Sequence, residues 1–326
     1  MKILIAEDSP TWWRLIKKAL EDAGFKVVTE KVAQENLVKE LKNYDAVLVR
    51  SATKIRKDII DACPNIKLIG RGGVGLDNID AEYAKSKGIE VINTPAASSQ
   101  SVAELVFAHL FTVVRFLHDS NRNMPLAGEK EFKDLKKKYS KGVELRGKTL
   151  GIIGFGRIGQ ATAKTAIGLG MKVMAADPYI ADATIELEFF DSNSISIKIK
   201  TVPINEVLSK SDFITLHVPG IGKPLITRKE IELMKNGVIL INASRGGIVN
   251  ETDLLEALNS GKVGFCGLDV FENEPTPDIK LLMHPNVSLS PHIGASTNEA
   301  QERIGLELAE KVIDKLSVLL PGTSSH

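Results

Sequence analysis

The chain has little of several features that mark whole classes of protein. Its two cysteines, Cys63 and Cys266, make neither a metal motif nor a disulfide framework. We expect both in the core, in a protein of a reducing compartment. The formal net charge of +1 gives no support for binding to nucleic acid or to an acidic membrane surface. No apolar run approaches the ~18 residues of a membrane span, and no signal-peptide pattern opens the chain. These absences favour a cytoplasmic protein without nucleic-acid, membrane or metal partners.

The rest of the composition is that of an ordinary globular protein, with 43% hydrophobic and 25% charged residues. A length of 326 residues suggests about two domains of ~150 residues each. Short apolar runs alternate with helix-forming segments, a pattern typical of α/β proteins with parallel sheets. Strands are expected over residues 3–6, 26–29, 46–49, 67–69, 89–92, 150–153, 171–176, 213–217, 238–241, 264–268 and 287–289. Helices are expected over residues 12–23, 102–117, 254–258 and 296–316.

Two segments depart from this alternation. Residues 184–202 alternate apolar and polar side chains, which predicts a small antiparallel hairpin with its turn near residues 191–193. Residues 121–142 are polar and include three consecutive lysines, which we interpret as a solvated face. His109, inside the helix expected over 102–117, is expected in the core or at an interface and not as a ligand.

A glycine-rich segment over residues 148–177 organises the second half of the chain. An apolar run precedes Gly154-Phe155-Gly156-Arg157-Ile158-Gly159, and a helix-forming segment and a second apolar run follow. This is the strand, turn, helix and strand context of a dinucleotide fingerprint. Gly154 allows the tight turn, Gly156 lets a pyrophosphate approach, and Gly159 lets helix and strand pack closely. Asp177 lies near the ~20-residue spacing of an acid that binds a ribose 2′-hydroxyl, which favours NAD over NADP.

Two arginines in the first half also lie where predicted strands end. Arg50-Ser51 follows one strand, and Arg71 begins a glycine-rich loop that includes Gly73 and Val74. Glycines free backbone N–H groups for an anion, and each guanidinium can fork onto carboxylate or phosphate oxygens. Surface or structural ion pairs are the alternative for both arginines.

Three strand ends in the second half supply reactive side chains, at residues 242–247, 269–275 and 291–296. Removal of a proton from a substrate hydroxyl, and its return to a carbonyl, need a base within reach. His292 is a natural acid/base, because histidine changes protonation near neutral pH. Glu274 could hold its other ring nitrogen, and Arg245 could bind a substrate carboxylate and polarise the carbonyl.

Together these segments resemble the D-isomer-specific 2-hydroxyacid dehydrogenases. The resemblance rests on VRSATK at 49–54, GRGGVGLDNID at 70–80, SRGGIVNE at 244–251 and PHIGAST at 291–297. It implies an α/β fold with two Rossmann-like domains. A doubly wound parallel NAD-binding domain over 98–294 would be inserted into a flavodoxin-like substrate domain formed by 1–97 and 295–326. It also implies a homodimer.

The resemblance also implies a role for individual residues. Arg245, Glu274 and His292 would be catalytic, with Arg245 and His292 also contacting substrate. Arg50, Ser51 and Arg71 would hold a substrate phosphate, with Gly73 and Val74 near the carboxylate and cofactor. The remaining NAD contacts would come from Val74, Gly154, Gly156, Arg157, Ile158, Gly159, Asp177, Val218, Ala243, Asp269 and Gly294.

These residues favour NAD-dependent oxidation of 3-phospho-D-glycerate to 3-phosphohydroxypyruvate, the first step of phosphorylated serine biosynthesis. Reduction of glyoxylate or hydroxypyruvate is the alternative within the family, and a non-enzymatic NAD-sensing corepressor is the alternative outside it. Residues 1–43 match the family only in their strand and helix pattern. The chain ends soon after His292, so we expect no C-terminal regulatory domain and no serine feedback through one.

Overall fold

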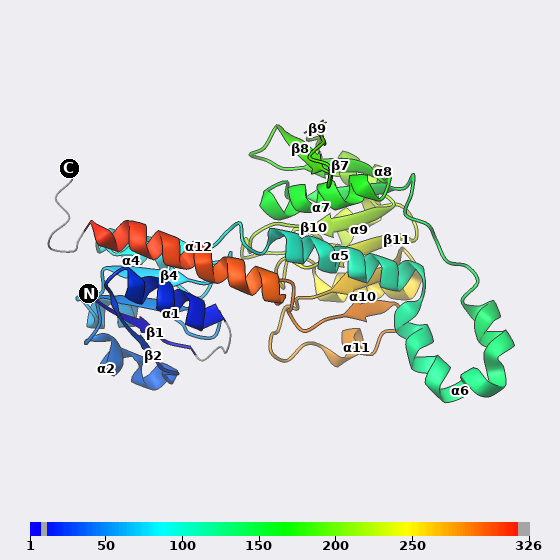
Figure 1. The fold of residues 1–326 in the computed structure, drawn as a ribbon. Helices are drawn as coiled ribbons and strands as arrows, with labels where there is room; N and C mark the ends of the chain where they lie inside the picture. Colours follow the sequence, from blue (N-terminus) through cyan, green and yellow to red (C-terminus); the bar gives the residue numbers. More distant parts are fainter. Residues whose placement is uncertain (8–11, 319–326) are drawn as a thin grey trace. The chain divides into compact units, whose positions relative to one another are not determined.

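The computed structural model describes residues 1–7 and 12–318, with the side chain of Trp12 excepted. The chain divides into two compact units. The first comprises residues 1–98 together with the segment from Ala295 onward, and the second comprises Ser99–Gly294. Each unit is built on a parallel sheet, which confirms the predicted α/β class (Figure 1).

The sheet of the first unit has five parallel strands in the order β2-β1-β3-β4-β5. The strands are β1 (Lys2–Ile5), β2 (Lys26–Thr29), β3 (Ala46–Val49), β4 (Leu68–Arg71) and β5 (Glu90–Asn93). The chain reverses direction across the sheet between β1 and β3, as in flavodoxin-like folds, and ligands of such sheets bind beyond the carboxyl ends of the strands. The unit's helices are α1 (Trp12–Asp22), α2 (Leu37–Leu41), α3 (Lys57–Ala62), α4 (Ala81–Ser86) and α12 (Asn298–Ser317).

Helix α12 belongs to the first unit because its apolar face completes that unit's core. The buried side chains Ile304, Leu308, Val312 and Leu316 recur every four residues, the spacing that places them on one face of a helix. They join a cluster with residues of β1 and α1, including Ile16. A second cluster on the other face of the sheet is formed with α2, α3 and α4.

The sheet of the second unit has six parallel strands in the order β13-β12-β11-β10-β6-β7. They are β6 (Thr149–Ile153), β7 (Lys172–Ala176), β10 (Phe213–Leu216), β11 (Val238–Asn242), β12 (Val263–Leu268) and β13 (Val287–Leu289). One face packs against α5 (Ser99–Val114) and α7 (Arg157–Gly168). The other packs against α8 (Ile204–Lys210), α9 (Arg228–Leu233) and α10 (Glu251–Ser260), and the short α11 (Ile279–Leu282) packs near the edge. The strand order reverses between β6 and β10, which makes the carboxyl end of β6 the expected ligand position.

Two helices replace the single helix expected over 102–117. Helix α5 ends at Val114, because Phe116 has a φ of 56°, which an α-helix does not allow. Helix α6 (Leu117–Lys138) then runs through much of the polar stretch, past Pro125 and a break at Glu131. Among its side chains only Leu135 is buried, and α6 extends away from the sheet of its own unit (Figure 1).

Among the helices of residues 1–7 and 12–318, no single one is long and apolar enough to cross a membrane. Helices α5 and α6 reach that length and composition only when taken together, and they are bent by 55° with respect to each other.

The predicted hairpin is present as β8 (Asp182–Glu188) and β9 (Ser194–Lys200), which pair antiparallel in a separate two-stranded sheet. Ile185 and Ile199 turn inward and join the core cluster under α5 and α7. Both cysteines are free and buried, as expected from the sequence.

Candidate active site

The glycine turn between β6 and α7 is tightly packed around Gly154 and Gly159 and has free space beside Gly156. Gly154 has a φ of 91°, and a Cβ there would lie 2.4 Å from the carbonyl oxygen of His217. A Cβ on Gly159 would lie 2.2 Å from the carbonyl oxygen of Gly154. A Cβ on Gly156, at the N-terminus of α7, would meet no atom within 4 Å. The turn therefore leaves space for a pyrophosphate beside the free N–H groups of α7, so these residues fit a dinucleotide.

Asp177 follows β7 and lies against this turn. Its Oδ2 accepts a hydrogen bond of 2.7 Å from the backbone N–H of Phe155, inside the glycine sequence. Its Oδ1 accepts from the N–H groups of Tyr179 at 2.8 Å and Ile180 at 3.1 Å. Three donors thus hold a half-buried carboxylate beside the turn, which is the position a ribose-binding acid requires.

The other residues expected to contact the cofactor near this turn lie around its open side. Val218 follows β10, and its Cγ1 would lie 3.0 Å from a Cβ on Gly154. Arg157 is exposed and Ile158 half-buried in the first turn of α7. The expected cofactor residues of this loop therefore surround one strand end.

His292 and Glu274 form a hydrogen-bonded pair in the second unit. Nδ1 of His292 lies 2.8 Å from Oε2 of Glu274, and Oε1 of Glu274 accepts from the backbone N–H of Phe271 at 3.0 Å. The carboxylate is therefore fixed on both oxygens, and it leaves the other ring nitrogen of His292 for a reacting group. Half of the His292 side chain is exposed, so that nitrogen can be reached from solvent.

Arg245 is carried by the loop after β11, and Asn242 shapes that loop. Nδ2 of Asn242 donates to the carbonyl oxygen of Arg245 at 2.9 Å, and its Oδ1 accepts from both the backbone N–H and the hydroxyl of Ser244. A Cβ on Gly246 would lie 1.8 Å from the carbonyl oxygen of Phe271. The loop with Ala243 and Arg245 therefore packs directly on the segment that leads to Glu274.

Asp269 is buried after β12, and its carboxylate holds the loop that carries His292. Its Oδ1 accepts from the hydroxyl of Ser290 at 2.6 Å and from the N–H of Ile293 at 2.8 Å. Its Oδ2 accepts from the N–H of Gly294 at 2.8 Å, and its backbone carbonyl accepts from the N–H of His292 at 2.8 Å. Asp269 was expected beside the cofactor; in the structure both of its oxygens are engaged by residues 290–294.

The two arginines of the first unit lie at neighbouring strand ends. Val49 of β3 is level with Arg71 of β4, and Arg50 follows directly. The guanidinium of Arg71 lies over Gly73, where a Cβ would be 2.0 Å from Nη1. Burial lowers the pKa of Arg50, and the nearby Glu7 carboxylate opposes that shift.

Glu7 and Asn78 hold the Arg50 loop, a role that the sequence patterns did not predict for either residue. Oε1 of Glu7 accepts from the N–H groups of Arg50 at 2.9 Å and Thr53 at 3.0 Å. Nδ2 of buried Asn78 donates at 2.6 Å to the carbonyl oxygens of the same two residues. Ser51, between them, is exposed. The one local signal for Glu7 and Asn242 is their place at the end of a strand.

The loop after β4 is held by a threonine and an asparagine from the end of β5. The N–H of Gly73 donates to the hydroxyl of Thr94 at 2.8 Å. The carbonyl oxygen of Val74 accepts from Nδ2 of Asn93 at 2.5 Å. The loop expected to contact substrate and cofactor is therefore anchored to the neighbouring strand.

Comparison with known proteins identifies the fold and its chemistry. Residues 107–294 match the family model described as D-isomer specific 2-hydroxyacid dehydrogenase, NAD binding domain. A hydroxypyruvate reductase of Thermotoga maritima is 46% identical over 90% of this chain and 91% of its own. A D-3-phosphoglycerate dehydrogenase of Methanocaldococcus jannaschii is 43% identical over 90% of this chain, which spans 54% of that protein.

A solved structure supports the same assignment. The NAD⁺-bound 3-phosphoglycerate dehydrogenase of Entamoeba histolytica superposes with a TM-score of 0.77 and 28% identity, over 100% of this chain and 98% of its own. The cofactor is therefore NAD, as the fingerprint predicted. The chain belongs to the D-isomer specific 2-hydroxyacid dehydrogenases and is an NAD-dependent enzyme of that family.

Proposed function

We propose that the chain oxidises 3-phospho-D-glycerate to 3-phosphohydroxypyruvate in the cytoplasm, as the first step of phosphorylated serine biosynthesis. The observation that carries this proposal is the pair Arg50 and Arg71 at neighbouring strand ends. A phosphate brings two negative charges, and arginine binds phosphate oxygens through a planar fork of donors. An unphosphorylated 2-hydroxy acid offers no such group.

The reaction assigns one task to each reactive side chain. His292 takes the hydroxyl proton during oxidation and returns it during reduction, and Glu274 holds Nδ1 of the ring through the 2.8 Å contact. Arg245 binds the substrate carboxylate and polarises the carbonyl. NAD, held at the glycine turn and Asp177, would supply the acceptor for the hydride that leaves the carbon carrying the hydroxyl.

The second candidate is reduction of hydroxypyruvate or glyoxylate. The observation in its favour is the hydroxypyruvate reductase of Thermotoga maritima, of which the chain spans 91% at 46% identity. In that case Arg50 and Arg71 would serve the structure of their loops. A non-enzymatic NAD-sensing corepressor finds no support, because the matched relatives are named as enzymes.

Steady-state kinetics with NADH distinguish the two candidates. We expect kcat/KM for 3-phosphohydroxypyruvate to exceed that for hydroxypyruvate and glyoxylate. Arg50→Ala should raise KM for the phosphorylated substrate by roughly tenfold or more, and leave KM for hydroxypyruvate within about twofold. Arg14→Ala, at an exposed position of α1, is the control. Higher efficiency on the unphosphorylated acids would overturn the phosphate assignment.

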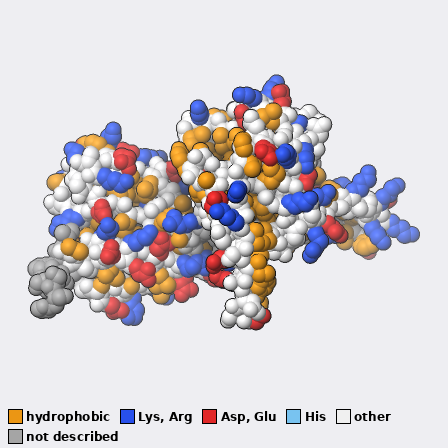
Figure 2. Space-filling model, turned by 90° about the horizontal axis from the view of Figure 1, so that it is seen from above, with side chains coloured by type: hydrophobic (Ala, Val, Ile, Leu, Met, Phe, Trp, Pro, Cys, Tyr) orange, Lys and Arg blue, Asp and Glu red, His pale blue; other side chains and the backbone are white. Residues whose placement is uncertain are grey.

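We also propose that the protein is a homodimer assembled through α5 and α6. Apolar side chains exposed along these helices are Phe111, Leu117, Met124, Leu126 and Phe132, at 41%, 52%, 43%, 86% and 56%. Figure 2 shows Lys and Arg side chains gathered on α6, which projects at the right of the view, with hydrophobic side chains between them. A second copy would cover this apolar surface, which costs free energy when left in water.

Sedimentation velocity at micromolar concentration tests the assembly. We expect a dimer for the wild type and a monomer for the Leu126→Asp, Phe132→Asp double variant. Leu233→Asp, at an exposed apolar position of α9, should remain a dimer. A monomeric wild type, or a dimeric double variant, would contradict the proposal.

A further inference from the structure

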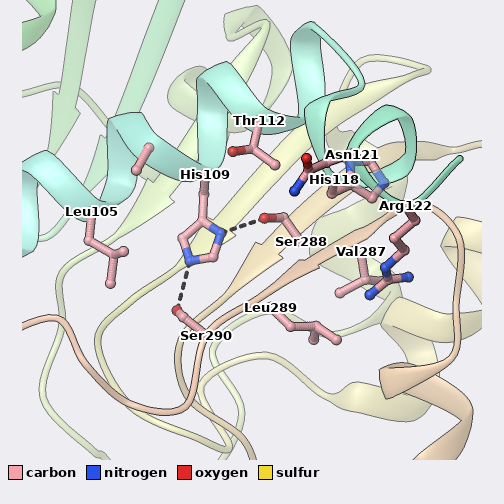
Figure 3. Close-up of a pocket in the computed structure, with 11 residues that line it drawn as sticks. Leu105, His109, Thr112, His118, Asn121, Arg122, Val287, Ser288, Leu289 and Ser290 are labelled. Atoms are coloured by element: carbon pink, nitrogen blue, oxygen red, sulfur yellow. Dashed lines mark hydrogen bonds between the residues drawn. The ribbon is translucent and has the colours of Figure 1, made fainter. Parts of the chain in front are cut away.

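His109 on α5 is a buried imidazole with a hydroxyl at each ring nitrogen. Its Nδ1 lies 2.8 Å from Oγ of Ser288, and its Nε2 lies 2.9 Å from Oγ of Ser290 (Figure 3). Ser288 is in β13 and Ser290 follows that strand, two residues before His292. The ring therefore connects a helix to the strand end that carries the reactive histidine.

The backbone beneath His109 is shaped to receive its ring. A Cβ on Gly267, in β12, would lie 2.7 Å from Cβ and 2.9 Å from Cγ of His109. Any larger residue at 267 would displace the imidazole. The ring also borders a cavity of about 400 Å³, which Thr112 lines one turn further along α5 (Figure 3).

The hydrogen bonds around His109 have a defined direction. Ser290 donates its single hydroxyl hydrogen to Oδ1 of Asp269 at 2.6 Å, so it can only accept from His109. Nε2 therefore carries the hydrogen, and Nδ1 of the neutral ring accepts from Ser288. Burial lowers the pKa of His109 while the Asp269 charge opposes that shift, and the neutral tautomer agrees with the direction. The bonds run from Ser288 through His109 and Ser290 to the Asp269 carboxylate.

The far end of this chain of hydrogen bonds is the loop of His292. The Asp269 carboxylate accepts from the N–H groups of Ile293 and Gly294, and the Asp269 carbonyl accepts from the N–H of His292. His292 has a φ of 55°, a left-handed conformation that is costly for residues other than glycine. Such a conformation persists only where several surrounding contacts enforce it.

We propose that His109 is a positioning residue for hydride transfer. It orients Ser290, which fixes the Asp269 carboxylate, which in turn holds the loop of His292 in its left-handed conformation. The inference rests on the proposed acid/base role of His292, although His109 itself touches neither substrate nor cofactor in this scheme.

Two substitutions at His109 separate positioning from packing. His109→Leu introduces an apolar side chain of similar size and removes both hydrogen bonds, whereas His109→Gln keeps a donor and an acceptor. On the best 2-keto acid substrate we expect His109→Leu to lower kcat roughly tenfold, with KM and the NADH Kd within about twofold. His109→Gln should recover most of kcat. Thr112→Val is the control and should match the wild type.

Ser290→Ala tests the positioning role independently, and it remains informative if His109→Leu fails to fold. If His109 acts through Ser290, the double variant His109→Leu, Ser290→Ala should be no slower than the slower single variant. Unchanged kcat in His109→Leu, equal losses in the Leu and Gln variants, or fully additive losses would each overturn the positioning role. Full turnover in His292→Asn would instead refute the acid/base assignment, and the His109 variants would still report on His109 separately.

Discussion

Asn242 and Asp269 lie at the carboxyl ends of neighbouring strands, β11 and β12, and each is nearly inaccessible to solvent. Asn242 uses both ends of its amide to close the loop of Arg245, and Asp269 uses both carboxylate oxygens to close the loop of His292. Buried polar groups without partners are costly, so each loop is held in the one conformation that satisfies them. Asn242 and Asp269 therefore fix the positions of Arg245 and His292.

His292 is the acid/base of the proposed reaction. His292→Asn should lower kcat by on the order of 10²–10⁴, because the remaining groups cannot move the hydroxyl proton. The NADH Kd, measured by fluorescence titration, should stay within about twofold. His284→Asn makes the same change outside the site and should retain wild-type kcat. Comparable activity in the two variants would refute the assignment.

We propose that cofactor choice depends on the carboxylate of Asp177. Asp177→Ala removes the carboxylate that repels a 2′-phosphate, so the kcat/KM ratio of NAD to NADP should fall roughly tenfold or more. The Asp182→Ala control removes an exposed carboxylate that pairs with Lys198 at 3.2 Å on the hairpin, and the ratio should not change. An unaltered ratio in Asp177→Ala would remove Asp177 from cofactor selection.

At the scale of elements, the close contact between the Arg245 loop and the segment at Phe271 leaves no room for a side chain at position 246. Gly246→Ala would place a methyl group 1.8 Å from the Phe271 carbonyl oxygen, so the Arg245 loop must move off its neighbour. We expect a loss of about 1–3 kcal/mol in the free energy of unfolding, and a raised KM for the 2-keto acid.

The matched control for this change is Gly168→Ala at the end of α7. A Cβ there meets no atom within 4 Å, so the free energy of unfolding should rise by about 0.4–1 kcal/mol. Urea denaturation followed by circular dichroism measures both variants. A Gly246→Ala variant as stable as Gly168→Ala would show that the two loops do not need their close approach.

For the whole molecule, a desolvated imidazole makes stability depend on pH. Desolvation of the ring lowers the pKa of His217 to about 3, and its Nε2 lies near the hydroxyls of Thr162 and Thr215, at 3.2 and 3.1 Å. Below pH ~6.5 the His217 imidazole takes up a proton in the unfolded chain, whereas it stays neutral in the folded chain. The free energy of unfolding should therefore fall by up to about 1.4 kcal/mol per pH unit as pH decreases toward 3.

Urea titrations at pH 7, 6 and 5 measure this dependence. In His217→Gln the side chain cannot take up a proton, so the free energy of unfolding should decline less steeply with falling pH. An identical slope in the variant and the wild type would exclude His217 as the source.

The features that the amino-acid pattern predicted correctly are local ones. Apolar runs placed the strands to within a few residues, glycine spacing located the tight turn between β6 and α7, and alternation identified the hairpin of β8 and β9. These signals are readable because a strand, a tight turn or a hairpin depends on residues close together in the chain. The sequence pattern did not predict helix α6, because its polar sequence contains Pro125 and only Leu135 among its side chains is buried.

The tertiary structure alone decided which side chains hold the reactive ones. Glu274 and His292 are 18 residues apart, Glu7 and Arg50 are 43 apart, and His109 and Ser290 are 181 apart. No periodicity reports a hydrogen bond between such distant residues, because the bond exists only when separate helices, strands and loops meet in the folded chain. The family was therefore legible in the sequence, whereas the hydrogen bonds that orient Arg245, Glu274 and His292 appear only in the folded chain.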